Sequence, residues 1–151
     1  MSNNTIQSVG TIKVLSVKEP HASMIKEGQF KHIETRSWRT NYRGELYIHA
    51  SKSKVTKQIM TEHNGMFNLL QNTDFDYGCI IAKCKLVDCV YMTEEFIEEV
   101  KKNPNEYISG FYSVGRYAWI LEDIEMLEKP IPVAGNRSIW KHTAQSVQKT
   151  A

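Results

Sequence analysis

The chain has 151 residues, a hydrophobic fraction of 41% and a formal net charge of +2. This length fits one ordinary domain, and the apolar fraction is enough for a core that depends on neither disulfides nor metal. The small net charge excludes a protein that coats DNA by charge alone, so any site for an anion must be local.

The first half of the chain predicts strands around one short helix. Alternating apolar residues, prolines and glycines predict a strand over 11–17, a helix that starts near Pro20 and stops at Gly28, strands over 31–38 and 45–50, and a turn over 41–44. If the last two strands pair in antiparallel fashion around this turn, Tyr47 and His49 lie beside Glu34 and Arg36.

The second half predicts a helix over 53–63, a loop-like or weakly helical stretch over 66–76 and a long strand over 78–91. A helix over 93–103, a strand over 117–121, an extended segment over 127–133 and a short helical turn over 137–141 follow. Strands outnumber helices and do not alternate strictly with them. The pattern favours a mixed or antiparallel curved sheet, or a small barrel, with helices on its rim, and disfavours a doubly wound sheet.

Cysteines and hydropathy limit the class of protein. Cys79, Cys84 and Cys89 fall in one predicted strand, where five-residue separations place neighbours roughly 17 Å apart, too far to share a metal ion. An odd number of cysteines without a secretory signal favours a reducing compartment. No apolar run approaches the roughly 20 residues of a membrane span. We expect a cytoplasmic protein with no cofactor, no metal and no membrane partner.

The segment 28–52 is the most informative, because cations alternate with flat rings in it. Its members are Lys31, Arg36, Arg39, Arg43 and Lys52 with Trp38, Tyr42 and Tyr47. Such a mixture suits a polyanion that also has faces to stack on, which describes a nucleic acid. The alternative is two amphipathic strands whose polar sides face water.

Strand alternation predicts that Glu34 and Arg36 share one face, together with His32 and Trp38. Glu34 can then hold the guanidinium of Arg36 for a phosphate or a base, or the two can form an ordinary ion pair. Lys31 is a catalytic candidate if it is desolvated, whereas a lysine at the start of a strand is more often solvated.

Several stretches, in this order, resemble the ASCH (activating signal cointegrator homology) domain. They are 15–25, 34–38, 42–52, 78–81, 86–89, 116–121 and 130–140. We therefore expect a flexible N-terminus over 1–10, an ASCH domain over 11–143 and a tail over 144–151. The resemblance implies an α+β, PUA-like fold: a small mixed β-barrel flanked by helices, with a cleft on its surface.

The resemblance also implies a nucleic-acid binder, with RNA or single- or double-stranded DNA as partner. A family motif that lines the cleft reads here as Gly28, Lys31, Glu34 and Arg36, with one extra residue between Gly28 and Lys31. The loop 16–20 forms the opposite lip. The residues expected to bind are Ser16, Lys18, Pro20, His21, Lys31, Glu34, Arg36, Trp38, Arg43, Tyr47, His49 and Lys52.

Two alternatives remain open at this point. One branch of the family removes the acetyl group of N4-acetylcytidine with a lysine and a threonine. Here Lys31 is present but Glu34 occupies the threonine position, so the nucleophilic hydroxyl is missing where that reaction needs it. The catalytic candidates for this alternative are Lys31 and Glu34. A ribonuclease would use Lys31, Tyr47 and Ser51. The other alternative is a protein-interaction module, recognisable by an exposed apolar patch without a basic cleft.

Overall fold

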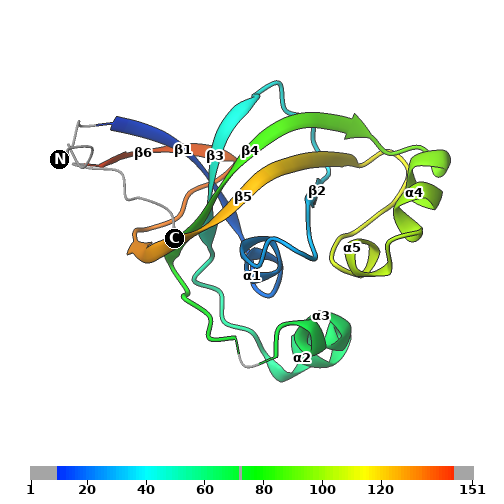
Figure 1. Cartoon of the computed structure of the whole chain (residues 1–151), viewed down its shortest axis with the longest axis horizontal. Coiled ribbons are helices and arrows are strands. Elements are labelled where there is room, and N and C mark those ends of the chain that lie inside the picture. Colours follow the sequence, from blue (N-terminus) through cyan, green and yellow to red (C-terminus); the bar gives the residue numbers. More distant parts are fainter. Residues whose placement is uncertain (1–9, 72, 145–151) are drawn as a thin grey trace.

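The computed structural model describes residues 10–71 and 73–144, which form a curved sheet with short helices around it (Figure 1). The strands are β1 (Gly10–Val17), β2 (Ile33–Arg36), β3 (Gly44–Ala50), β4 (Cys79–Tyr91), β5 (Tyr117–Pro132) and β6 (Ile139–Ala144). The helices are α1 (His21–Lys26), α2 (Lys57–Glu62), α3 (Asn64–Leu69), α4 (Glu94–Lys101) and α5 (Pro104–Ile108).

The sheet is mixed, as predicted, with the strand order β2-β5-β4-β3-β1-β6. Strands β1 and β3 are parallel, and the other neighbours are antiparallel. Within the described residues, β2 and β6 are the two ends of the sheet and do not pair with each other. The α+β class is therefore confirmed, but the sheet is curved and open rather than closed into a barrel.

The predicted hairpin between the strands after Gly28 is wrong. Strand β2 pairs with β5, with Glu34 opposite Trp119, while β3 pairs with β4. The reason is that β4 and β5 form a long antiparallel pair with a free edge on each side, and β2 and β3 occupy opposite edges. Strand β2 is also shorter than the predicted 31–38.

The ends of the helices follow capping chemistry. Thr93 caps α4 by accepting a hydrogen bond from the Phe96 N–H, and two glutamates lie in the first turn, so this helix begins where the sequence predicts it. Thr56 rather than Ser53 caps α2, so this helix begins later than expected. Asn64 starts α3 instead of ending the predicted helix. Among the described residues, no helix has both the length and the apolar character needed to cross a membrane.

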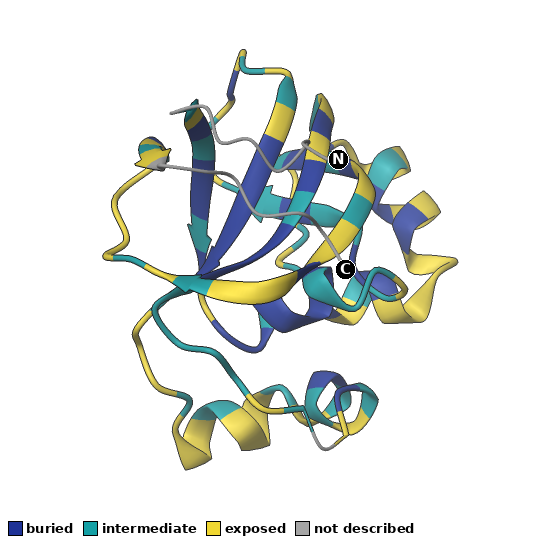
Figure 2. Ribbon diagram, turned by 60° about the vertical axis from the view of Figure 1, so that its left-hand side comes forward, coloured by how far each residue is buried: buried dark blue, intermediate teal, exposed yellow. Residues whose placement is uncertain are grey.

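Both faces of the sheet are covered. One face packs Leu15, Ile48 and Trp119 against α1, and the other buries Ile12, Tyr47 and Trp140. Figure 2 shows the buried residues gathered on the strands and α1, while α2 and α3 stand apart; α2 is largely exposed and α3 is mostly half-buried. Cys84 is buried in the core, and Cys79 and Cys89 pack against that core; all three are free thiols.

Candidate nucleic-acid interface

Two pockets adjoin at one edge of the sheet. The first, which we call the arginine pocket, has a volume of about 480 Å³ and is lined by Ser16, Val17, Lys18, His21, Glu34, Thr35, Arg36, Ser51, Phe111 and Arg116. The second, the strap pocket, has a volume of about 450 Å³ and is lined by Ser16, His49, Ser51, Lys52, Ser53, Gly135, Asn136 and Arg137. We call the β5–β6 connection, residues 133–138, the strap. The pockets share Ser16 and Ser51.

The parallel pair β1 and β3 explains why these residues meet. Ser16 lies opposite His49 in the register, and the Ser51 N–H donates to the Val17 carbonyl at 2.9 Å. Because parallel strands end at the same edge, the chain leaves both strands side by side. The polar residues that follow them, including Lys18 and Lys52, therefore face the same region.

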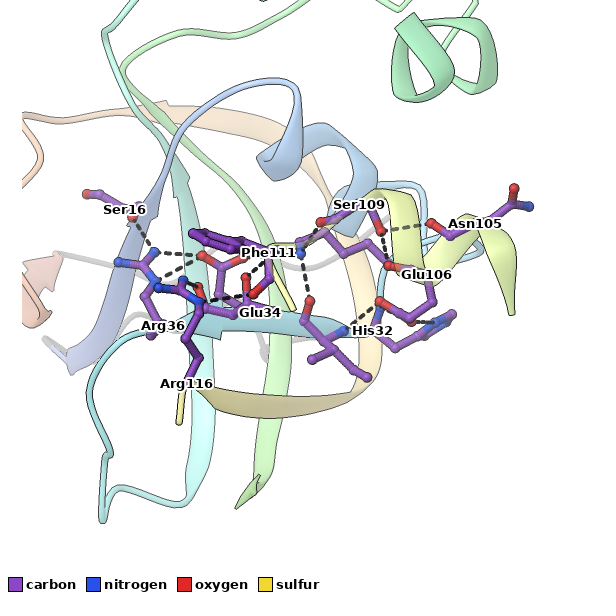
Figure 3. A network of polar contacts seen from close by, with 12 residues as sticks. Ser16, His32, Glu34, Arg36, Asn105, Glu106, Ser109, Phe111 and Arg116 are labelled. Atoms are coloured by element: carbon purple, nitrogen blue, oxygen red, sulfur yellow. Dashed lines mark hydrogen bonds and ion pairs between the residues drawn. The ribbon is translucent and has the colours of Figure 1, made fainter. Parts of the chain in front are cut away.

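An ion pair holds the arginine that gives the first pocket its name. Arg36 donates to the Glu34 carboxylate through Nε at 2.9 Å and Nη2 at 2.8 Å, which confirms the predicted pairing of these residues. Nη2 also donates to the Ser16 carbonyl at 3.1 Å, so Arg36 connects β2 with β1 (Figure 3). The guanidinium is thus fixed in orientation on two sides.

Lys31 is the second cation that contacts the Glu34 carboxylate. It is wholly buried, and Nζ donates to the carbonyls of Ile33 at 2.6 Å and Ser109 at 2.5 Å and contacts Glu34 Oε1 at 3.4 Å. Three acceptors match the three donors of an ammonium. Burial alone raises the pKa of Glu34, but the charges of Lys31 and Arg36 outweigh burial and lower it, so the carboxylate is ionised.

Helix α5 explains how a lysine at this position becomes buried. Glu106 of α5 accepts hydrogen bonds from the backbone N–H groups of His32 and Ile33, at 2.8 and 3.1 Å, and so fixes the start of β2 against the helix (Figure 3). Ser109, just after α5, supplies one carbonyl to Lys31. The solvated alternative for Lys31 is therefore wrong, and Lys31 does not line either pocket.

His21 lies at the wall of the arginine pocket, with its ring 5.7 Å from that of His63. Burial and then the positive charge of Lys31 lower the pKa of His21 to about 4, so the ring is neutral at pH 7. Pro20, the N-cap of α1, is buried, and Lys18 is exposed and lines the arginine pocket. The 16–20 loop thus adjoins Glu34 and Arg36, as expected.

Besides Lys31 and the buried Pro20, three of the expected residues line neither pocket: Trp38, Tyr47 and Arg43. The Trp38 ring packs edge-on against Trp119 at 4.7 Å, and Tyr47 is only 2% exposed in the core on the other face of the sheet. Arg43 donates to the carbonyls of Thr40 and Tyr42, away from both pockets. Tyr47 was expected to lie beside Arg36 because the two strands were expected to form a hairpin, and the structure lacks that hairpin. Tyr47 therefore lines neither pocket and offers no stacking surface there.

Other pocket residues were missed from the sequence. Phe111 is 64% exposed and lies against Arg116, whose guanidinium carbon is 4.4 Å from the ring centroid. Arg116 also donates to the Thr35 carbonyl at 3.4 Å. Arg116 and Arg137 belong to segments that carry the family resemblance, which was the available signal, but those segments are remote in sequence from the basic stretch.

The charges of the two pockets are strongly unbalanced. Five lysines and arginines line them: Lys18, Arg36, Lys52, Arg116 and Arg137. Glu34 is the only carboxylate residue in either lining, and it is already paired. Lys18, Lys52 and Arg137 form no ion pair with any residue in the described ranges. The region therefore presents free positive charge.

Comparison with known proteins identifies the family. The ASCH domain model matches residues 15–131. The chain is 31% identical over 133 residues to human "Activating signal cointegrator 1" and 29% identical to the mouse protein, covering 84% of this chain and 22% of each relative. It is 27% identical over 108 residues to "UTP--glucose-1-phosphate uridylyltransferase 1" of Streptococcus pyogenes, covering 67% of this chain and 35% of that protein. The chain thus spans about a fifth of the length of the cointegrators, and it belongs to the ASCH domain family.

Proposed function

We propose that the chain binds nucleic acid, with the arginine pocket and the strap pocket acting as one basic cleft. The observation that carries the proposal is the free charge of Lys18, Lys52 and Arg137 around two pockets that share a wall. Lysines and arginines that are not neutralised by the protein are available for phosphates. Membership of a family that includes "Activating signal cointegrator 1" supports the same class of ligand.

Phe111 favours a nucleic acid over a simple anion. Its ring is largely exposed beside the arginine pocket and is supported on one side by Arg116. A base can stack on such a ring, and stacking tolerates any sequence because every base has a flat face. An inorganic anion has no flat face that could stack on this ring.

Arg36 adds a hydrogen-bond donor of fixed orientation to the free cations and to the Phe111 ring. Its Nε and Nη2 donors are occupied by Glu34 and by the Ser16 carbonyl, and Nη1 has no partner in the described part of the chain. The free edge of a fixed guanidinium can donate to a phosphate oxygen or to an acceptor on a base. Glu34 then acts by holding Arg36 rather than by touching the ligand.

Salt dependence tests the proposal. Fluorescence anisotropy with labelled single-stranded RNA and DNA should show affinity that falls as salt rises, with a log–log slope of about −0.7 for each phosphate neutralised. Replacing Lys18, Lys52 and Arg137 together by Gln should flatten that slope by about 2. The control replaces three lysines outside the pockets by Gln: Lys57, Lys85 and Lys102. Affinity that ignores salt, or that falls equally in the control, contradicts the proposal.

The geometry gives less support to hydrolysis of N4-acetylcytidine or of RNA. All three donors of Lys31 are occupied, and the Thr35 hydroxyl accepts a hydrogen bond from the Phe111 N–H at 3.0 Å. A nucleophile or base must be free to reach the substrate. Incubation with N4-acetylcytidine or RNA followed by chromatography checks this: turnover that disappears in Lys31→Ala would favour the hydrolase. The basic pockets likewise favour nucleic acid over a protein-interaction module.

A further inference from the structure

A chain of hydrogen bonds runs through Ser16, which lines both pockets. Trp140 Nε1 lies 3.1 Å from Ser16 Oγ, Ser16 Oγ lies 3.0 Å from His49 Nδ1, and His49 Nε2 lies 2.8 Å from the Val133 carbonyl oxygen. A carbonyl only accepts hydrogen bonds, so the proton of His49 is on Nε2. His49 is wholly buried and has no carboxylate among these partners, so a second proton on the ring would leave an unpaired buried charge. Its Nδ1 is therefore an acceptor.

These directions fix what the Ser16 hydroxyl can offer. Its proton is donated to His49 Nδ1, and one of its two lone pairs accepts from the indole N–H of Trp140, which can only donate. The second lone pair has no donor among the residues that the structure describes. Ser16 thus presents a hydrogen-bond acceptor, and no donor, to a ligand.

The strap holds this arrangement in place. A Cβ atom added at Gly135 would lie 2.8 Å from both Ser16 Oγ and His49 Cε1. Only glycine allows the strap to approach so closely, and the approach leaves the Ser16 and His49 side chains little room to take other rotamers. The acceptor is therefore preorganised before any ligand arrives.

The position of Ser16 matches the order of groups within a nucleotide. Ser16 lines both pockets. On one side lie Phe111 and the free edge of Arg36, which suit a base, and on the other lie Lys52 and Arg137 with no carboxylate, which suit phosphate. In a nucleotide the sugar stands between base and phosphate, so the sugar is the group expected beside Ser16.

We propose that Ser16 accepts a hydrogen bond from the 2′-hydroxyl of a ribose, so that the cleft prefers RNA to DNA. The inference rests on the proposed function, since it assumes a nucleic acid in the cleft. Deoxyribose has no donor at that position, and the 2′-hydroxyl is the group by which proteins tell RNA from DNA. One net hydrogen bond corresponds to a preference of about threefold to tenfold.

Three single strands of one sequence test this on the unaltered protein. The first is RNA, the second its deoxy form with uracil bases, and the third its 2′-fluoro form, which retains an RNA-like sugar pucker but cannot donate. At equal salt, RNA should bind about threefold to tenfold more tightly than either of the others. Equal binding of RNA and DNA overturns the inference and leaves the proposed function standing. Binding of the 2′-fluoro strand as tight as RNA also overturns it, and binding of no strand overturns both.

Protein variants assign the preference to its residue. Ser16→Ala should lower RNA affinity to the level of DNA, while Ser113→Ala, the same change at an exposed serine outside the pockets, keeps the preference. Because Ser16→Ala also removes the hydrogen-bond partner of His49 Nδ1 and of Trp140 Nε1, the readout is the ratio of RNA to DNA affinity in one folded preparation. Loss of the preference in Ser51→Ala and not in Ser16→Ala would overturn the assignment.

Discussion

The two pockets hold their positive charges in opposite ways. In the arginine pocket, Arg36 is paired with a buried carboxylate that also neutralises the wholly buried Lys31. In the strap pocket, Lys52 and Arg137 are exposed and form no ion pair with described residues. The first set of charges belongs to the framework of the fold, and the second is free for a ligand. Substitutions at Glu34 or Arg36 should therefore cost stability, and substitutions at Lys52 or Arg137 should cost affinity.

The largest effect is expected from Glu34→Gln. This change leaves Lys31 as a buried charge without its counter-ion, and breaking a buried ion pair costs about 3 to 5 kcal/mol in the free energy of unfolding. Urea denaturation measures the loss. The control is Glu45→Gln, which breaks the exposed pair with Lys83 at 3.3 Å and should cost less than about 1 kcal/mol. Similar losses in the two variants would mean that Glu34 is not part of the framework.

Acidification should weaken the same framework through His21. The folded-state pKa is about 4, below the ordinary value of 6.5. As the pH falls below 6.5, the unfolded chain binds a proton that the folded chain does not, so stability decreases until the pH reaches about 4. The loss is at most about 3 kcal/mol, and less if the partly exposed ring is well screened.

Unfolding free energies measured between pH 7 and pH 4 check this, with His21→Gln as the variant. The variant should lose less stability over this window than the unaltered chain. His142→Gln, on the edge strand β6, is the matched control and should keep the original pH dependence. An unchanged dependence in His21→Gln would show that His21 is not held neutral by burial.

The framework was more predictable from the sequence than the free charges were. Strand alternation placed Glu34 and Arg36 on one face, and the structure confirms their ion pair. Alternation is a local property, so it survives even though β2 pairs with β5 instead of β3. The burial of Lys31 was not predictable, because the carbonyl of Ser109 comes from the residue that follows α5, far along the chain.

The strap pocket shows why the rest could not be predicted. Arg137 and Gly135 reach Ser16 only because β5 and β6 are joined across the end of β1, and no pattern in the basic segment indicates that crossing. The prediction that Tyr47 belongs to the binding site was wrong for a related reason. Alternation places it opposite to its neighbours, but only the packing of Trp140 and Ile12 shows that this face is buried too. Both features depend on contacts between distant segments.

Phe111 is an aromatic residue that we expect to contact the ligand and not to stabilise the fold. Phe111→Ala should weaken binding of single-stranded nucleic acid by about 1 to 3 kcal/mol, which is the range for one stacked base. Because the ring is 64% exposed, the free energy of unfolding should hardly change. Val114→Ala removes a comparably exposed apolar side chain outside the pockets and should leave affinity unchanged. Loss of stability in Phe111→Ala would place the ring in the framework instead.

The smallest effects should come from single neutralisations in the strap pocket, and they separate the two classes of charge most directly. Lys52→Gln and Arg137→Gln should each weaken binding roughly fivefold at 0.1 M salt and flatten the salt slope by about 0.7. Neither side chain makes an ion pair with a described residue, so neither variant should shift the urea midpoint. Arg36→Gln, in contrast, should lower the urea midpoint, because it removes the hydrogen bonds of Arg36 to Glu34 and to the Ser16 carbonyl. If Arg137→Gln lowered the urea midpoint as much as Arg36→Gln, Arg137 would stabilise the fold instead of binding phosphate. The ligand-binding cations would then not include the strap.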